Sequence, residues 1–421
     1  MPKKRIVLTT FGSLGDLHPY LGIACELKAR GHEPIIATLD IYREKVEGCG
    51  IGFRLLRSSL VAEPNAEIIK QVLDRRHGIE FIVRTLLMPA LRVAYEDTLE
   101  ATQGVNLIVS HPLTLASRVA AEVQKIPWVS TQLSPLGFLS PHDPPVLPAA
   151  PYLRRFRRFG VGLFGPVMAF AKHSVRHWTE PYRVLRQQLG LPPCPDPFFA
   201  SSYAPSLVLA LFSELLGAKQ KDWPKQTVIT GFPFFDSDRR AELDPRLARF
   251  LDAGSPPIVF TLGTSAVMAP GRFYQDSIEA AQMLGMRAIL LVGNYFAQLP
   301  NQLPHNVMAF DYAPFSQLLP RTAVVVHQGG VGTTGQAMRS GCPMLVIPYA
   351  LDQPDNAARV ERLGIARVIT RAAYSAQRAA EELNRLLTAE RYEIRARTVG
   401  DRIMQEDGAV TASAHLESIL A

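Results

Sequence analysis

Three glycines, Gly330, Gly332 and Gly335, follow a run of β-branched residues and have the G-x-G-x-x-G spacing of a phosphate-binding turn. Glycines let a backbone approach a ligand, and the helix after such a turn offers free N–H groups and a positive dipole end to an anion. A second turn of small residues, at 263–265, ends another apolar run. Two such turns in one half of the chain fit a diphosphate held from two sides.

The glycine spacing alone favours a dinucleotide-dependent oxidoreductase, in which Asp352 stands near the distance expected of a ribose-binding acid. Such an acid should directly follow the second strand, but Pro348, Tyr349 and Ala350 intervene. This reading also gives no role to His327 or to the turn at 263. The motif therefore leaves open which phosphate-bearing ligand is bound.

Alternating strands and helices must position these turns. In the first half we expect strands over 4–12, 34–39, 105–111 and 126–133, with helices over 18–32 and 115–123. Pro19 would lie in the first turn of the helix over 18–32, and Gly31 would end it. After the polar stretch at 236–257, strands are expected over 258–265, 287–293, 306–312, 323–330 and 342–349. The pattern predicts an α/β protein with two doubly wound domains and a ligand site in the cleft between them.

Length and composition agree with this organisation. A chain of 421 residues is too long for one ordinary core. Its 47% hydrophobic and 20% charged residues are typical of globular proteins. The four scattered cysteines predict neither a disulfide framework nor a zinc site, so a reducing cytoplasm is expected. The apolar run at the N-terminus ends at Gly12 and is read as a strand, not a signal peptide, and no stretch is long enough to span a membrane.

The net charge of +7 is concentrated in one segment. Between positions 152 and 190 eight basic residues stand against Glu180 alone, while the rest of the chain is balanced. This distribution argues against general affinity for nucleic acid. The basic residues are mixed with aromatic ones such as Phe156, Phe159 and Trp178. Two readings remain open: a solvated helix face, or contact of residues 152–178 with an anionic membrane or a lipophilic acceptor.

A set of residues gives the chain a resemblance to a known family. His327, Gly329 and Thr333, followed by Pro348 and the pair Asp352 and Gln353, resemble the donor-sugar motif of family 1 glycosyltransferases of the GT-B fold. The stretches at 327–357 and 12–32 look most like the bacterial sterol-glucosyltransferase and rhamnolipid-rhamnosyltransferase branch. Residues 60–230 match that branch only in general layout.

The resemblance implies two Rossmann-like domains that face a central cleft. Residues 1–235 would bind the acceptor, and residues 236–390 would bind the nucleotide sugar. Residues 391–421 would form a C-terminal helix that packs back on the N-terminal domain. The implied reaction is inverting transfer of a hexose from a UDP- or dTDP-sugar to a hydroxyl of a lipid, sterol, phenolic or other natural product.

The resemblance also assigns donor-binding residues. His327 and the amides after it would hold the diphosphate as charge grows on the leaving nucleotide. Asp352 and Gln353 would bind sugar hydroxyls. Tyr312 stands where plant relatives stack a tryptophan on uracil, and Gly335 stands where they bind ribose with a glutamate, which leaves uridine versus thymidine open. The predicted donor site is Gly263, Thr264, Ser265, Tyr312, His327, Gly329, Gly330, Gly332, Thr333, Asp352 and Gln353.

An inverting transferase needs a base for the acceptor hydroxyl. In the related branch an aspartate takes this position, which is Asp16 here, and His18 is a second candidate. His111 stands where plant members carry the partner aspartate, so we expect a reversed pair of Asp16 with His111. The imidazole would abstract the proton or position the carboxylate. Asp16 can also act as a helix N-cap.

No metal and no cofactor are predicted, because the nucleoside diphosphate sugar is a co-substrate. The D-S-D sequence at 236–238 lies in a polar linker beside two arginines and is read as solvated. The expected partners are the nucleotide sugar and an apolar acceptor, without nucleic acid. The expected location is the cytoplasm, with contact to the inner face of the membrane through residues 152–178. A nucleotide-sugar epimerase of similar fold is the nearer alternative function, and a non-catalytic lipid-binding relative is a third.

Overall fold

The structure, a computed structural model, describes residues 2–57, 65–194, 196–236 and 243–421. The chain divides into two compact units. Unit 1 comprises Met1–Pro64, Arg76–Phe235 and Glu406–Ala421. Unit 2 comprises Asn65–Arg75 and Asp236–Gln405. Each unit is therefore built from segments that are distant in the sequence.

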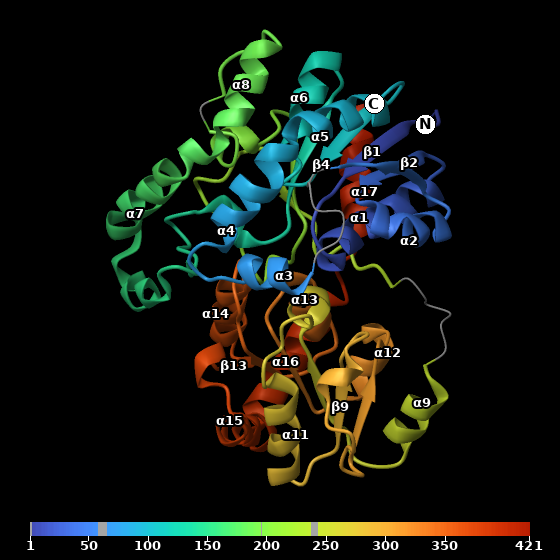
Figure 1. Cartoon of the computed structure of the whole chain (residues 1–421), viewed down its shortest axis with the longest axis vertical. Helices are drawn as coiled ribbons and strands as arrows, with labels where there is room; N and C mark the ends of the chain where they lie inside the picture. Colours follow the sequence, from blue (N-terminus) through green and yellow to red (C-terminus); the bar gives the residue numbers. More distant parts are fainter. Residues whose placement is uncertain (1, 58–64, 195, 237–242) are drawn as a thin grey trace. The chain divides into compact units, whose positions relative to one another are not determined.

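Among its described residues, unit 1 has a seven-stranded sheet in the order β3-β2-β1-β4-β5-β6-β7 (Figure 1). Neighbouring strands pair in parallel. The strands are β1 (Arg5–Thr9), β2 (Glu33–Thr38), β3 (Gly52–Leu55), β4 (Leu107–Ser110), β5 (Trp128–Gln132), β6 (Val208–Ala210) and β7 (Thr227–Ile229). In β1, Ile6, Val7 and Leu8 are fully buried, as expected for a parallel strand covered on both faces.

The helical segments of unit 1 are α1 (Leu14–Ala29), η1 (Asp40–Tyr42), α2 (Arg43–Gly48), α4 (Gly78–Phe81), the π-helical η2 (Ile82–Leu87), α5 (Met88–Ala101), α6 (Leu115–Gln124), η3 (Pro135–Phe138), η4 (Pro151–Phe159), α7 (Gly160–Ser174), η5 (Arg176–Thr179), α8 (Glu180–Gln188), η6 (Ala200–Ser202) and α17 (Gly408–Leu420). Helix α17, drawn in red, packs on α1, drawn in blue, although almost 400 residues separate them in the sequence (Figure 1).

Helix α1 begins four residues earlier than the sequence pattern predicts. Ser13 is the N-cap of the helix. Ser13 and Asp16 form a capping box, in which the side chain of each residue accepts a hydrogen bond from the backbone amide of the other. Pro19 consequently lies inside the helix and not in its first turn. Gly31 follows the last turn with a φ of +91°, so the predicted glycine stop is confirmed.

Unit 2 has, among the residues described, a six-stranded parallel sheet in the order β10-β9-β8-β11-β12-β13. Its strands are β8 (Ile258–Thr261), β9 (Ala288–Leu291), β10 (Val307–Phe310), β11 (Val324–His327), β12 (Met344–Val346) and β13 (Ala366–Val368). Its helical segments are α3 (Ala66–Val72), α9 (Pro245–Asp252), α10 (Gly263–Ala266), α11 (Phe273–Met283), η7 (Phe296–Gln298), α12 (Phe315–Leu318), η8 (Leu319–Arg321), α13 (Val331–Arg339), α14 (Gln353–Leu363), η9 (Arg371–Ala373), α15 (Ala376–Thr388) and α16 (Glu390–Ile403).

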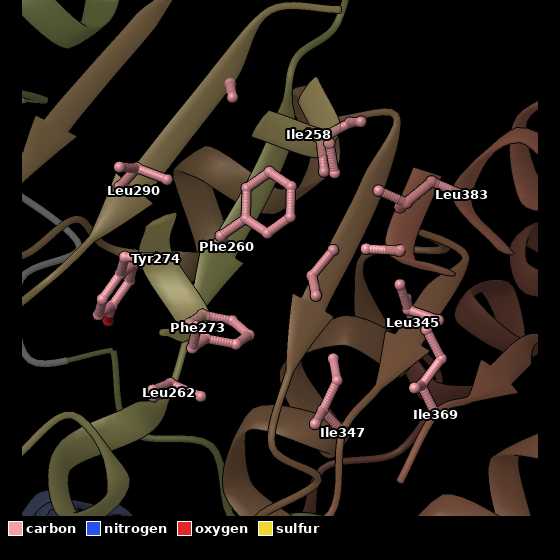
Figure 2. Close-up of a cluster of buried hydrophobic side chains, with 14 of the residues drawn as sticks. Ile258, Phe260, Leu262, Phe273, Tyr274, Leu290, Leu345, Ile347, Ile369 and Leu383 are labelled. Carbon is pink, nitrogen blue, oxygen red and sulfur yellow. The ribbon is translucent and has the colours of Figure 1, made fainter. Parts of the chain in front are cut away.

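The core of unit 2 lies where helices α11 and α15 pack with the sheet. Figure 2 shows Ile258, Phe260 and Leu262 of the β8 segment within a cluster of buried apolar side chains. Ile69 and Leu73, from the α3 segment, belong to the same cluster. Burying side chains of this size contributes roughly 1.5–3 kcal/mol each, which explains why this short helix belongs to unit 2.

Every predicted strand is present, but four short strands were not predicted. These are β3, β6, β7 and β13, each only three or four residues long. They lie at or beside the edges of the two sheets. The expected single C-terminal helix over 391–421 is two helices: α16 lies in unit 2 and packs on α13, while α17 lies in unit 1 and packs on α1.

Candidate functional site

In unit 2 the predicted donor residues gather at the carboxyl ends of the strands. Strands β8 and β11 are neighbours although β9 and β10 separate them in the sequence, so the sheet changes direction between them. Ligands of open parallel sheets bind at such a switch point. The turn at Gly263 follows β8, and the turn at Gly329 and Gly330 follows β11. The structure therefore brings the two predicted glycine turns to the same edge of one sheet.

Both turns require glycine for physical reasons. Gly263 has a φ of +61° and Gly329 a φ of +89°, in the left-handed region that other residues rarely adopt. A Cβ atom on Gly329 would lie 2.9 Å from Cγ1 of Val346 and 3.2 Å from the carbonyl oxygen of Gln353. The turn after β11 is thus packed tightly against the segment that follows β12.

His327 ends β11 and is fully buried. Its Nδ1 accepts a hydrogen bond of 3.1 Å from the Gly329 amide, so the neutral ring carries its proton on Nε2. Among the described residues Nε2 has no hydrogen-bond partner. Burial lowers the pKa of His327 from its usual value to about 3. The imidazole is therefore a neutral donor with an unused N–H.

The N-terminus of α13 lies beside this donor. Gly330 is the N-cap, and the side chain of the N-cap residue cannot bond the free amides of the first turn. Gly332 and Thr333 lie in that first turn and are partly exposed. A helix end and a buried neutral N–H together form a place for an anion. Nothing in this arrangement requires a cationic side chain.

The segment after β12 is held by polar side chains. Gln353 is buried, and its Oε1 accepts hydrogen bonds from the amides of Tyr349 (2.8 Å) and Ala350 (3.1 Å). Both of these hydrogen bonds of the Gln353 side chain thus go to its Oε1. Asp352 is partly exposed at the start of α14. Its Oδ2 accepts a hydrogen bond of 2.7 Å from Nδ2 of Asn356.

Asn356 was not among the predicted residues. It is fully buried, and the same Nδ2 also donates to the carbonyl oxygen of Gly329 over 3.0 Å. One amide group thus connects the glycine turn after β11 with the carboxylate after β12. The only signal in the sequence was an asparagine four residues after Asp352, which is one helical turn away.

The remaining predicted donor residues lie at the same edge of the sheet. Tyr312 follows β10 and is 60% exposed, so it is not a core residue. Thr264 is exposed in α10, and Ser265 belongs to the same short helix.

In unit 1 the predicted pair lies at the carboxyl ends of β1 and β4, which are again the neighbouring strands of a switch point. Asp16 stands 3.5 Å from His111, measured between Oδ1 and Nε2. The other oxygen, Oδ2, accepts hydrogen bonds from the amide (2.7 Å) and the hydroxyl (3.0 Å) of Ser13. The structure therefore brings Asp16 and His111 together, and Ser13 fixes the carboxylate.

The tautomer of His111 follows from its surroundings. Its Nδ1 accepts a hydrogen bond of 3.1 Å from the Leu113 amide, so Nε2 carries the proton of the neutral ring and points it at Asp16. The histidine side chain is 4% exposed, whereas that of Asp16 is 34% exposed. Of the two groups, the carboxylate is the one more exposed to solvent.

A tight turn supports the carboxylate. Gly12 has a φ of +124°, and a Cβ there would meet Oδ2 of Asp16 at 2.4 Å. The Tyr42 hydroxyl donates to the Gly12 carbonyl oxygen over 3.0 Å. Burial raises the pKa of Tyr42, and the negative charge of Asp16 raises it further, so the phenol stays a donor. His18 lies beside Phe235, with ring centroids 5.5 Å apart.

A largely apolar pocket of about 10 Å³ lies within unit 1. Leu113 and Thr114, which follow His111, line it together with Leu87 and Met88 at the end of the π-helical segment. A volume of this size holds one small group. Except for Thr114, the side chains that line the pocket are aliphatic or that of Met88.

The described residues contain no group of three or more metal-ligating side chains. In the D-S-D sequence, Asp236 is not solvated as expected, because its side chain is only 9% exposed and pairs with Arg339 at 2.9 Å. The expected solvation was wrong since the carboxylate meets a cation at the end of α13. Ser237 and Asp238 lie outside the described residues. Within the part of the chain that the structure describes, no helix has the length and apolarity needed to cross a bilayer.

Family models match both halves of the chain. Residues 6–136 match the glycosyltransferase family 28 N-terminal domain. Residues 280–411 match the C-terminal domain described as erythromycin biosynthesis protein CIII-like.

Among curated proteins, O-mycaminosyltylonolide 6-deoxyallosyltransferase of Streptomyces fradiae is 29% identical, over 98% of this chain and 97% of its own length. Glycosyltransferase GtfE of Amycolatopsis orientalis is 30% identical, over 86% of this chain and 85% of its own length. A sterol 3-beta-glucosyltransferase of Yarrowia lipolytica is 27% identical, over 97% of this chain but only 28% of its own length.

Solved structures share the fold. The glycotransferase of kitacinnamycin matches with a TM-score of 0.74 at 22% identity, and each chain is covered completely. The spinosyn rhamnosyltransferase SpnG, complexed with thymidine diphosphate, matches with a TM-score of 0.70 at 18% identity over 98% of this chain and all of the other. The predicted fold class, two Rossmann-like domains of the GT-B type, is confirmed.

Proposed function

This chain belongs to the family 1 glycosyltransferases, and from that membership we propose that it moves a hexose from a nucleoside diphosphate sugar to a hydroxyl of an apolar acceptor, with inversion at the anomeric carbon. The chain covers 97% and 85% of the length of two curated transferases, at 29% and 30% identity. No comparison supports an epimerase or a dinucleotide oxidoreductase, the two enzyme alternatives that the sequence left open.

The observation that carries the donor assignment is the buried, neutral His327 with an unused Nε2–H beside the start of α13. An N–H group that is already fixed in this position needs no reorganisation of the protein when charge develops on the leaving diphosphate. The helix end alone contributes only about 0.3–1 kcal/mol. The imidazole and the first-turn amides therefore act together, and the turn at Gly263 approaches from the neighbouring strand.

The sugar and the base of the donor would contact the flanking residues. Asp352 accepts from a sugar hydroxyl, and Gln353 donates to one through Nε2. Tyr312 stacks on the nucleobase. A relative that binds thymidine diphosphate supports a pyrimidine nucleotide, so uridine and thymidine diphosphate sugars are the donors to test.

In unit 1, Asp16 would act as the base. As the acceptor oxygen attacks the anomeric carbon, its proton passes to the carboxylate, the new C–O bond forms, and the bond to the diphosphate breaks. The Nε2 of His111 lies 3.5 Å from Oδ1, and Ser13 donates two hydrogen bonds to Oδ2. In this proposal His111 is a positioning residue, and His18 stays the second candidate for the base. An apolar part of the acceptor would lie on Leu113 and its aliphatic neighbours.

We further propose that residues 152–178, here called the basic segment, bring the enzyme to a membrane surface with anionic lipids. Phe170, Tyr152 and Phe159 are 74%, 61% and 53% exposed, and arginines lie between the last two. Phe164 and Met168 are buried with Leu139, which fixes the segment to unit 1. Exposed aromatic rings beside arginines suit the boundary between headgroups and acyl chains.

Flotation with liposomes tests the membrane contact. The chain should float with vesicles that contain anionic lipid and remain at the bottom with neutral vesicles, and Phe170→Ser should reduce flotation. If the wild-type chain ignores anionic vesicles, residues 152–178 form only a solvated face.

The proposed reaction is tested with a panel of UDP- and dTDP-hexoses against phenolic, steroid and lipid acceptors, followed by product mass. At least one pair should give a product heavier by one hexose unit. Asp16→Asn keeps the shape of the carboxylate but removes the base, so turnover should fall by about 10²- to 10⁴-fold at saturating donor and acceptor. Near-full turnover of this variant would overturn the role of Asp16. If no nucleotide sugar binds, the proposed function itself is wrong.

A further inference from the structure

Gln328, which directly follows His327, is a buried polar side chain without an assigned role. It is 7% exposed, and its Oε1 has no hydrogen-bond partner among the described residues. Buried polar atoms of folded proteins are nearly always paired, so an exception calls for an explanation. Since an unpaired buried oxygen costs about 1–3 kcal/mol, a carboxamide placed here without a ligand only destabilises unit 2.

The position of the carboxamide is fixed by the two glycine turns. A Cβ atom on Gly263 would lie 2.4 Å from Nε2 of Gln328, and one on Gly330 would lie 3.1 Å from it. Gly263 follows β8, and Gly330 is the N-cap of α13. The amide nitrogen of Gln328 therefore lies between the two turns, at the switch point of the sheet.

We propose that Gln328 is a further donor-binding residue, whose Nε2 donates to a phosphate oxygen and whose Oε1 accepts from a hydroxyl of the same nucleotide sugar. The assignment rests on the proposed function, because it takes the ligand to be a nucleoside diphosphate sugar. His327 offers a second buried, neutral N–H one residue away. Two neutral side-chain donors beside a helix N-terminus suit a diphosphate that must be released after each turnover.

Gln328 also explains the glycine at 263. Any larger residue there would displace the carboxamide and would adopt an unfavourable φ of +61°. The turn after β8 therefore leaves room for the Gln328 side chain, which comes directly after β11. This arrangement couples the two turns through one side chain that contacts the donor.

Two variants of matched size separate a ligand contact from a structural role. Gln328→Glu keeps the shape but places a carboxylate opposite the phosphates. Gln328→Leu removes both polar ends. Binding of UDP, of dTDP and of the corresponding nucleosides to the full chain is measured by calorimetry between pH 5.5 and 8.5, together with thermal unfolding without ligand.

A lost hydrogen bond to a charged group corresponds to a Kd increase of about 10- to 100-fold. We expect a loss of at least this size for the better-binding diphosphate in Gln328→Glu at pH 8.5, and partial recovery as the pH falls and the new carboxyl group takes up a proton. Gln328→Leu should bind about tenfold more weakly at every pH. Nucleosides, which lack phosphates, should bind to both variants as they bind to the wild type.

The unfolding data provide the second readout. Because Oε1 has no partner within the described residues, Gln328→Leu should unfold no earlier than the wild type in the absence of ligand. A lower unfolding temperature with unchanged diphosphate affinity would show that Gln328 is structural and overturn the inference. Wild-type affinity of Gln328→Glu for the diphosphate would also overturn it. If the wild type binds no diphosphate at all, the proposed function fails together with it.

Discussion

The histidine at the end of β11 illustrates how burial can suit a side chain to its task. With Nδ1 occupied by the Gly329 amide and a pKa lowered to about 3, His327 presents one N–H and no charge. A cationic side chain in the place of His327 would bind the product nucleoside diphosphate as firmly as it binds the nucleotide sugar. A neutral group interacts most strongly when charge has built up on the leaving group.

Two amide variants can separate the two nitrogens of this ring. In His327→Asn the side-chain oxygen can still accept from the Gly329 amide, but the donor at Nε2 is lost. In His327→Gln the side-chain amide keeps an N–H group near the position that Nε2 occupies in the histidine. Removing one such donor costs about 10²- to 10³-fold in kcat, so His327→Asn should be the slower enzyme. Steady-state kinetics with saturating acceptor checks this order, and equal kcat values would contradict it.

The same residue predicts how stability depends on pH. The pKa of His327 is lowered in the folded chain from 6.5 to about 3, so between these values the unfolded chain binds a proton that the folded chain does not. The contribution of His327 to the free energy of unfolding is fully present above pH 6.5. It falls by about 1.4 kcal/mol per pH unit as the pH decreases from 6.5 toward 3. Urea unfolding of unit 2 from pH 7.5 to pH 5 should show a steeper loss for the wild type than for His327→Asn. Parallel curves would mean that His327 takes up protons as freely in the folded chain.

The sequence could locate His327, Asp352 and Asp16, because each follows an apolar strand and belongs to a recognisable motif. It could not find Gln328 or Asn356. Their importance lies in atoms that meet across different strands and helices, such as Nδ2 of Asn356 with the Gly329 carbonyl. It also could not determine how the His111 ring is oriented toward Asp16, since this follows from the hydrogen bond that the Leu113 amide donates to Nδ1.

At the level of elements, α14 holds the turn of one strand against the end of the next. Asn356 on its first turns donates to both Gly329 and Asp352, and Gln353 fixes the loop before the helix. The backbone just after β12 adds a further connection, because the Ile347 amide donates to the His327 carbonyl oxygen over 2.8 Å. Hydrogen bonds therefore connect the two parts of the proposed donor site.

Asn356→Leu should weaken this connection. The side chain is fully buried and bonds a charged group, so its loss should cost about 1.5–3 kcal/mol. The affinity for the nucleotide sugar should fall more than that for the free diphosphate, because Asp352 is expected to bind the sugar. Calorimetry with both ligands measures the difference. An equal change for both ligands would show that Asn356 does not act through Asp352.

The alternation of strands and helices predicted the principal elements of both sheets, because long apolar runs in parallel strands are recognisable without the structure. The four missed strands are too short for such a signal, and their pairing is imposed by neighbours already in place. The early start of α1 was missed because the reciprocal bonds of Ser13 and Asp16, rather than Pro19, determine where the helix begins.

At the level of the whole molecule, unit 1 depends on a segment that follows unit 2 in the sequence. Leu416 and Ala412 of α17 are fully buried in unit 1. Glu417 accepts a hydrogen bond of 2.9 Å from Arg30 and stands 3.1 Å from His32. The helix therefore contributes both apolar packing and an ion pair to the surface of α1.

Leu416→Ala should destabilise unit 1 by about 2–5 kcal/mol, the usual cost of removing a buried leucine side chain. Ala414→Ser, at an exposed position of the same helix, should change stability by less than about 0.5 kcal/mol. Chemical denaturation followed by amide hydrogen exchange in β1 and β4 reports on unit 1 specifically. Similar exchange rates in the two variants would mean that α17 adds little to this unit.

The order of segments has a consequence for synthesis on the ribosome. Helix α1 is made almost first, but its partner α17 emerges only after residues 236–405 have been translated. Until then the side of α1 that α17 covers is either exposed to solvent or bound by a chaperone. Unit 2 in turn receives α3 early and can complete its core before α17 appears. The nascent chain should therefore gain a stable unit 2 before it gains a stable unit 1.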